Sequence, residues 1–170
     1  EIFEDPSAKG GAFANMYEGT DTSYGKITNG KLHAVIDSGS VITFYHEDGR
    51  VLLKEHFRRL RDEESMPLNI MGREYSNGIG DNFRIVARFV ARKGEKIFGM
   101  GQYQQKFLDV KGAELELAHR NSQASVPFAL SSLGYGFLWN NPAIGQVSFG
   151  KNVTEWTAVS TKQMDYWITA

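Results

Sequence analysis

Histidines are the side chains here best suited to metal binding or proton transfer, and the chain has four: His33, His46, His56 and His119. They fall in separate predicted segments. No HxH or HExxH pair brings two of them onto one face of a strand or helix, as zinc sites usually require. The sequence therefore favours surface or hydrogen-bonded structural histidines, and we expect neither a metal nor a cofactor.

A second candidate is the glycine pair in Gly99-Met100-Gly101, which could begin a dinucleotide-binding fingerprint. Gln104 stands where that fingerprint needs its third glycine. The residues that follow form short segments broken by turns, whereas a nucleotide-binding crossover requires a long helix. A nucleotide site is therefore not predicted.

Glu114 and Glu116 are two carboxylates whose spacing could serve acid–base chemistry. Residues two apart in a strand point to the same face, so both side chains are expected on one side of an extended segment. A solvated strand edge is the simplest explanation of this pattern. We assign no catalytic acid or nucleophile to residues 1–170.

Composition limits the elements that could position such residues. The chain has 170 residues, 41% of them hydrophobic, and a formal net charge of −1, which fits a single globular domain over residues 1–170. The charge gives no reason to expect a nucleic acid or an anionic membrane as a partner. No apolar run approaches the roughly 20 residues that span a bilayer.

Short alternating segments separated by turn residues predict an all-β fold. In the clearest one, residues 83–90, the side chains of Phe83, Ile85, Ala87 and Phe89 share one face. Residues 67–81 are expected to form a loop because they contain Pro, Asn and Gly, and residues 1–30 an extended arm or short strands. Further strands at the spacing of a β-sandwich are expected at residues 31–37, 41–45, 51–53, 126–131, 136–139, 146–149, 155–159 and 165–168.

The stretch 99–142 carries many spaced positions in the order GMGQYQQ, LD, RNSQ, PF and SSLGYGFLWNNP. This pattern resembles the end of the N-terminal β-sandwich of glycoside hydrolase family 31, which includes α-xylosidases and α-glucosidases. Residues 25–55 and 83–101 are also similar to this family. The resemblance implies an all-β, two-sheet antiparallel supersandwich that is galactose-mutarotase-like, with a catalytic (β/α)8 barrel absent from residues 1–170.

Residues 52–64 give conflicting signals. Leu52, His56 and Leu60 recur at helical spacing among charged residues, which by itself predicts a short amphipathic helix. The resemblance implies sheet or an excursion at a sheet edge, and we therefore predict an extended segment.

The resemblance also singles out Arg120 and Asn121 as candidate substrate-binding residues. In related enzymes a loop of the sandwich reaches the mouth of the barrel, and an Arg-Asp or Arg-Asn pair there binds the sugar. A guanidinium donates to hydroxyls in a fixed fork, and an amide both donates and accepts. Many members carry aspartate at the position of Asn121, which leaves a neutral contact. Alternatively, Arg120 caps a turn and Asn121 holds a positive φ.

The resemblance implies an accessory N-terminal domain of a retaining α-glycosidase that hydrolyses α-xylosidic or α-glucosidic bonds, and residues 101–104 and 108–109 look most similar to members that cleave xylosides. Its partners would be an oligosaccharide substrate and its own C-terminal barrel, and oligomer formation is left open. The fragment alone is predicted to be inactive. The alternative is a stand-alone carbohydrate-binding module that uses Trp139, Trp156 and Trp167, although core packing is the favoured role of these indoles.

Overall fold

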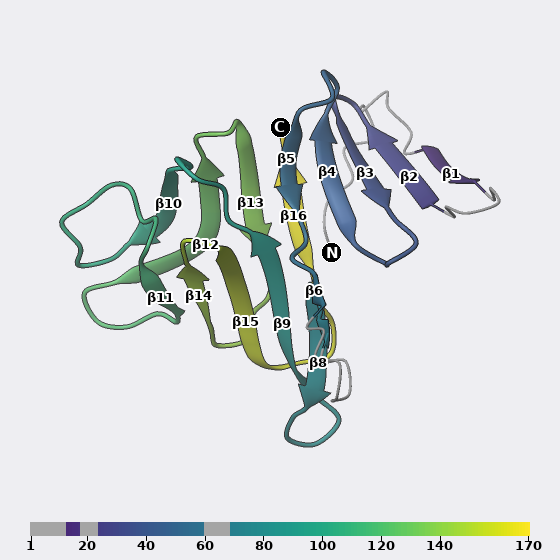
Figure 1. Ribbon diagram of the computed structural model, residues 1–170. Helices are drawn as coiled ribbons and strands as arrows, with labels where there is room; N and C mark the ends of the chain where they lie inside the picture. The colour runs from purple at the N-terminus through teal and green to yellow at the C-terminus, as the bar shows by residue number, and fades with distance from the viewer. Residues whose placement is uncertain (1–12, 18–23, 60–68) are drawn as a thin grey trace. The chain divides into compact units, whose positions relative to one another are not determined.

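The computed structural model describes residues 13–17, 24–59 and 69–170 (Figure 1). Every regular element within those ranges is a strand, and none of the described residues lies in a helix long and apolar enough to cross a membrane. The chain divides into two compact units, residues 1–53 and 54–170, which are described separately below. That residues 1–170 form a single domain stays a prediction.

The first unit is an antiparallel meander whose strands follow one another in chain order. Its turns have clear causes: the Asp37 carboxylate accepts hydrogen bonds from the backbone of Gly39 at 2.9 Å and of Val41 at 3.0 Å, and Gly49 has a φ of +83° and donates to the His46 carbonyl at 2.9 Å. The structure confirms the strands expected at residues 31–37, 41–45 and 51–53. The strands are β1 (Phe13–Tyr17), β2 (Tyr24–Asn29), β3 (Leu32–Ile36), β4 (Ile42–His46) and β5 (Val51–Lys54).

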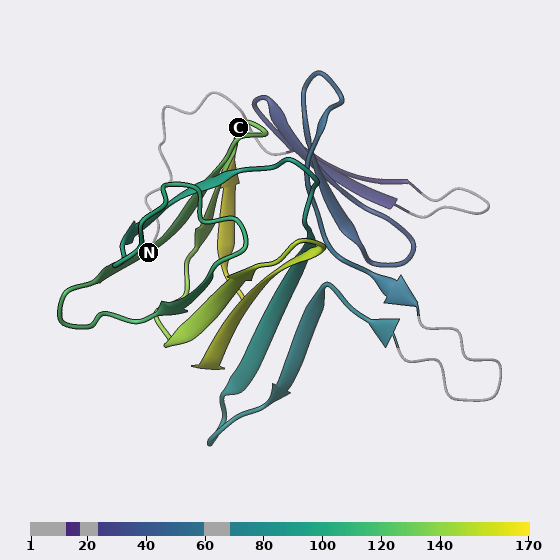
Figure 2. The ribbon, with the colours of Figure 1, turned by 60° about the vertical axis from the view of Figure 1, so that its left-hand side comes forward.

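The second unit contains two larger sheets, which Figure 2 shows as separate layers. The four-stranded sheet has the order β10 (Ile97–Gln102), β12 (Ala124–Ser131), β13 (Tyr135–Trp139) and β16 (Tyr166–Thr169). The five-stranded sheet has the order β11 (Glu114–Leu117), β14 (Gly145–Phe149), β15 (Val153–Thr161), β9 (Phe83–Val90) and β8 (Arg73–Asn77). A small ribbon pairs β6 (Arg58–Arg59) with β7 (Asn69–Ile70).

An aromatic core joins the two sheets of this unit. The ring of Phe137 on β13 lies 4.9 Å from that of Trp156 on β15 and 5.2 Å from that of Phe89 on β9. Trp139 stacks on Trp156 at 6.0 Å, and both indoles are almost fully buried. Each such side chain contributes about 1.5–3 kcal/mol by leaving water. The prediction of an all-β fold with two antiparallel sheets is confirmed.

Most of the predicted strands of this unit agree with the structure. Strand β9 covers residues 83–90 as expected, and Ile85, Ala87 and Phe89 are buried. Residues 52–64 are extended as far as the structure describes them, through residue 59, and residues 60–64 lie outside the described residues.

The prediction of a loop over residues 67–81 is wrong for the described part, because β8 forms there and pairs with β9, and residues 67–68 lie outside the described residues. Its side chains are mostly exposed, so the segment lacks the apolar alternation by which a strand is recognised. Backbone pairing at a sheet edge and the contact of Glu74 with Arg88 on β9, at 2.7 Å, hold it in place.

A close approach of β10 to β12 explains the glycines of the motif at 99–101. Gly99, Met100 and Gly101 all have positive φ, at +96°, +69° and +89°. The pairing jumps from Gly99 opposite Ala129 to Gly101 opposite Ser125, so β12 carries extra residues at this point. The two glycines therefore serve backbone geometry, since a Cβ at Gly99 would lie 2.5 Å from the Phe128 carbonyl oxygen.

Candidate functional site

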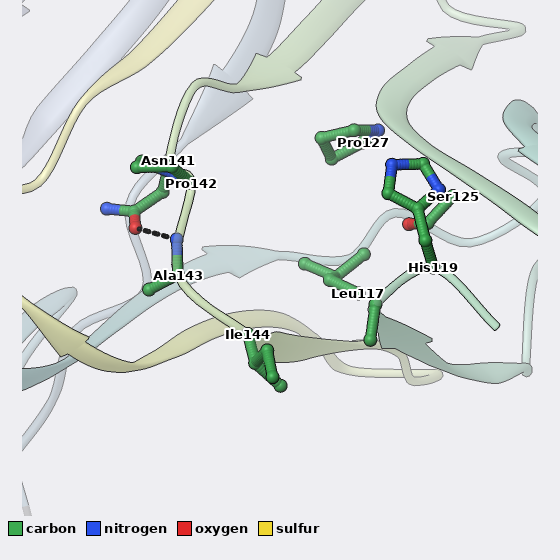
Figure 3. Close-up of a pocket in the computed structure, with 9 residues that line it drawn as sticks. Leu117, His119, Ser125, Pro127, Asn141, Pro142, Ala143 and Ile144 are labelled. Atoms are coloured by element: carbon green, nitrogen blue, oxygen red, sulfur yellow. Dashed lines mark hydrogen bonds between the residues drawn. The ribbon is translucent and has the colours of Figure 1, made fainter.

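A hollow of about 290 Å³ lies where β11 ends and β12 begins, beside the loop that the sequence predicts to be functional. In the view of Figure 3, Asn141 lies on one side of this hollow and His119 on the other. The lining mixes apolar and polar side chains without a cluster of charges. It is formed by Leu117, Ala118, His119, Ser125, Pro127, Asn141, Pro142, Ala143 and Ile144.

The two asparagines of the NNP motif fix one wall of the hollow. The Asn140 side chain donates to the Asp165 carboxylate at 2.6 Å. The Asn141 side chain donates to the Gln163 carbonyl at 3.1 Å, and its oxygen accepts from the backbone of Ala143 at 3.2 Å. Because these amides are already bonded within the chain, we interpret the motif as structural support for the wall.

Tyr103 fixes the opposite side. Its hydroxyl donates to the Glu116 carbonyl at 2.8 Å and forms a second hydrogen bond, also 2.8 Å, with the hydroxyl of Ser125. Glu116 belongs to β11 and Ser125 to β12, which lie in different sheets. This tyrosine of the GQYQQ motif therefore ties together the two strands that flank the loop 118–123.

Arg120 lies on that loop, with its side chain 63% exposed. Its Nε and one terminal nitrogen donate to the two oxygens of Glu116, each at 2.6 Å, which is the bidentate geometry of a strong Arg–carboxylate pair. Hydrogen bonding from Arg120 holds the pKa of Glu116 below its usual value, and Glu116 in turn raises the pKa of Arg120. The remaining N–H groups of the guanidinium can bind a hydroxyl ligand.

Asn121 is exposed in the turn that follows. The backbone N–H of Gln123 closes this turn by donating to the Arg120 carbonyl at 3.1 Å. The positive φ of the turn, +71°, belongs to Ser122, so the alternative that Asn121 holds it is wrong. Local preference favours asparagine over serine at a positive φ, so the sequence indicates the wrong residue of this turn, and the structure of the turn prevails over that preference.

A buried carboxylate that sequence reasoning missed lies elsewhere in this unit. Glu95 accepts hydrogen bonds from the hydroxyls of Ser131 at 2.6 Å and Tyr135 at 2.7 Å, and from the Lys111 ammonium at 3.1 Å. Burial alone would raise the pKa of Glu95, but these hydrogen bonds and the Lys111 charge outweigh it and lower the pKa. No local pattern could reveal this cluster, because its members come from distant segments.

Asp109 of the Leu-Asp motif is also structural. Its carboxylate accepts from the backbone N–H groups of Ile97 and Lys111, each at 3.0 Å. Both bonds lower the pKa of Asp109, and the bond from Ile97 has the larger effect. The motif thereby fixes the turn that carries Lys111 to Glu95.

The remaining candidates from the sequence are the three tryptophans and the two glutamates of β11. Trp139 and Trp156 are buried, as core packing predicts, whereas Trp167 on β16 is 44% exposed. Glu114 and Glu116 lie on the edge strand β11. Among the residues that the structure describes, no three His, Cys, Asp or Glu side chains are grouped so as to hold a metal ion.

Comparison with known proteins gives close relatives, although no family model matches the sequence. The chain is 49% identical over 155 residues to a protein of Pseudescherichia vulneris named "Uncharacterized family 31 glucosidase ORF2", which covers 85% of this chain. Over 96 residues, 56% of this chain, it is 38% identical to "Alpha-xylosidase A" of Aspergillus niger. The chain spans 29% of the length of the first relative and 13% of the second.

A solved structure is similarly close. The crystal structure of a GH31 α-xylosidase from a soil metagenome, complexed with xylose, aligns with 99% of this chain at a TM-score of 0.84 and 47% identity. The chain corresponds to 25% of that protein.

Proposed function

This chain is related in sequence and in fold to the N-terminal β-sandwich domain of glycoside hydrolase family 31, and we propose that it is an accessory domain of a retaining α-glycosidase. The observation that carries the proposal is the alignment of 99% of the chain with 25% of a GH31 α-xylosidase. A catalytic barrel would lie in the part of the longer protein that these 170 residues do not include.

The proposed reaction is a double displacement with net retention, and its two carboxyls would come from the barrel. The role we assign to this chain is to support the barrel and to bring the loop 118–123 to the substrate. Arg120 would donate to a sugar hydroxyl, with Glu116 holding two of its nitrogens in place. Asn121, exposed beside it, would add a neutral contact.

The residues that follow position 170 in the parent gene test the proposal most directly. A barrel there, with hydrolysis of an α-glycoside by the full-length protein, is the expected result. A parent protein without a barrel would overturn it.

Xylosides are the favoured substrates, because relatives named α-xylosidase occur among both the sequences and the solved structures. The relative with 49% identity is nevertheless named a glucosidase. Full-length protein should therefore be compared on nitrophenyl α-xyloside and nitrophenyl α-glucoside. A strong preference for the glucoside would reverse our order.

Removing the arginine tests the role of the loop. We expect Arg120→Ala in the full-length protein to lower kcat/KM roughly ten- to a hundredfold, because a charged donor to the sugar is lost. The melting temperature should change little, since the side chain is exposed. Arg84→Ala, which removes an exposed arginine on β9, should change neither quantity. Normal kinetics with a clearly lower melting temperature would instead mean that Arg120 only stabilises its turn.

A stand-alone carbohydrate-binding module is the competing function. Trp167 is 44% exposed and is the indole that such a module could offer to a sugar ring. Calorimetric titration of the 170-residue chain with xylo- and gluco-oligosaccharides separates the two functions. Micromolar binding would favour the module, and no detectable heat of binding would favour the accessory domain.

A further inference from the structure

The outer face of the four-stranded sheet is apolar across all of its strands. Residues directly opposite each other in an antiparallel pair point to the same side of the sheet, and Tyr135, Phe137 and Trp139 point inward to the aromatic core. The residues between them therefore face outward. Their register defines two rows, Phe98–Leu130–Gly136–Thr169 and Phe128–Leu138–Trp167, which we call the apolar face.

Large apolar side chains of this face are exposed to solvent. Leu130 is 47% exposed and Trp167 44% exposed. Phe128 packs over Gly136, where an added Cβ would lie 2.8 Å from its ring. Antiparallel sheets usually carry polar side chains on a solvated face, and Thr169 is the one residue of the two rows that follows this rule.

The five-stranded sheet of the same unit provides an internal comparison. Its outer face is tied together by ion pairs of Arg88 with Glu155 at 2.6 Å and with Glu74 at 2.7 Å. Of the nine residues in its two corresponding rows, only Val86 is apolar. Those rows are Glu114–Ser148–Glu155–Arg88 and Glu116–Gln146–Thr157–Val86–Glu74.

The apolar face continues into a second hollow of about 370 Å³ through Phe98, which belongs to both. Beside Phe98 the hollow is lined by residues of the motif, two of them polar amides but none charged: Gly99, Gly101, Gln102, Tyr103 and Gln105. Phe107 and Leu108 also line it and are 75% and 86% exposed. Aromatic and aliphatic side chains exposed to this degree on adjoining surfaces are typical of an interface.

We propose that the apolar face and the adjoining hollow form the surface on which the catalytic part of the same polypeptide packs. The inference rests on the proposed function and adds to it the side of the sandwich that is used. The occupant follows from length, because the chain spans only 13–29% of the relatives reported above and most of such a protein lies outside it. A permanently attached partner also explains the lack of charge, since obligate interfaces resemble a divided core.

Cysteine labelling tests this surface, because the chain has no cysteine of its own. Leu130→Cys probes the apolar face, and Val159→Cys on β15 is its matched control, since the two positions are 47% and 51% exposed. In the full-length protein, with labelled peptides identified by mass spectrometry, we expect maleimide to modify position 130 at least ~10-fold more slowly than position 159. Similar rates at the two positions would overturn the proposal.

Two further measurements keep the test decisive. Thr169→Cys probes the same face through a smaller change if Leu130→Cys does not fold, and we expect the same protection. Protection that already occurs in the 170-residue chain and grows with its concentration would assign the face to self-association and overturn the proposal. The labelling does not depend on activity, so an active glycosidase with an unprotected position 130 would refute only the docking surface. A parent protein without a barrel would refute the proposed function itself.

Discussion

Gly101→Ala should lower the free energy of unfolding of this chain by about 3–5 kcal/mol. An alanine Cβ at this position would collide with the carbonyl oxygen of Ala124 and would lie 2.7 Å from the backbone nitrogen of Val126. Both obstacles are backbone atoms of β12, so neither can move without breaking the pairing of β10 with β12. The φ of +89° adds strain of its own, because side chains disfavour this region.

Gly112→Ala is the matched control for this substitution. Gly112 has the same φ of +89°, but an added Cβ there meets no atom within 4 Å. It should therefore show the conformational cost alone, roughly 1–2 kcal/mol. Urea denaturation of both variants measures the difference. Equal losses of stability would mean that β12 yields to the methyl group and that close approach is not what requires Gly101.

Glu95→Gln should cost about 2–4 kcal/mol of stability. The carboxylate accepts from two hydroxyls and an ammonium in a buried site. The amide of glutamine has the same shape, but it leaves Lys111 without its counter-charge and directs an NH₂ group toward donors. Glu47→Gln removes an exposed carboxylate, 3.5 Å from Lys31, and should cost less than about 1 kcal/mol. Comparable losses in the two variants would contradict a stabilising role for the buried cluster.

Lowering the pH should reveal the contribution of the Glu95 carboxylate to the stability of the unmodified chain. The hydrogen bonds of Ser131 and Tyr135 and the charge of Lys111 hold the folded-state pKa of Glu95 below its ordinary value of 4.5, despite the opposing effect of burial. The stabilisation is therefore complete above pH 4.5 and is lost as the pH falls through the depressed folded-state pKa. One such group changes the free energy of unfolding by at most about 1.4 kcal/mol per pH unit. Glu95→Gln should lack this component in denaturation curves recorded between neutral and acidic pH.

Strands whose two faces differ were predictable from the sequence. Ile85, Ala87 and Phe89 share the face of β9 that meets the aromatic core, and their spacing of two residues identifies the strand, although Val86 on the other face is also buried. In β8 most side chains are exposed, so pairing with β9 stabilises the strand and the local sequence carries no signal of it. Leu52 and His56 illustrate the opposite case. Their spacing is that of a helix, but pairing with other strands of the fold makes this segment extended.

The site was less predictable than the fold. The resemblance indicated the loop with Arg120, but its bidentate pairing with Glu116 requires a strand and a turn to come together. Glu95, Lys111 and Tyr135 are likewise separated in sequence and meet only after both sheets have formed. Several residues of the family pattern, including Gly101, Asp109 and Asn141, have a backbone or turn contact in the structure that explains their residue type, and the pattern alone does not reveal these contacts.

The pairing of β9 with β15 determines when this sandwich can be completed during synthesis. β9 pairs with β8 through a short connection, but among the described residues its other edge pairs with β15, at residues 153–161 near the end of the described chain. A nascent chain that has emerged only through β14 therefore presents an open strand edge on β9, and Phe137 of its aromatic core still lacks the contact with Trp156. Such non-local pairing slows folding, and exposed strand edges favour aggregation. Chaperone binding should therefore last until β15 emerges from the ribosome, and translation pauses shortly before residue 153 should lower the yield of soluble protein.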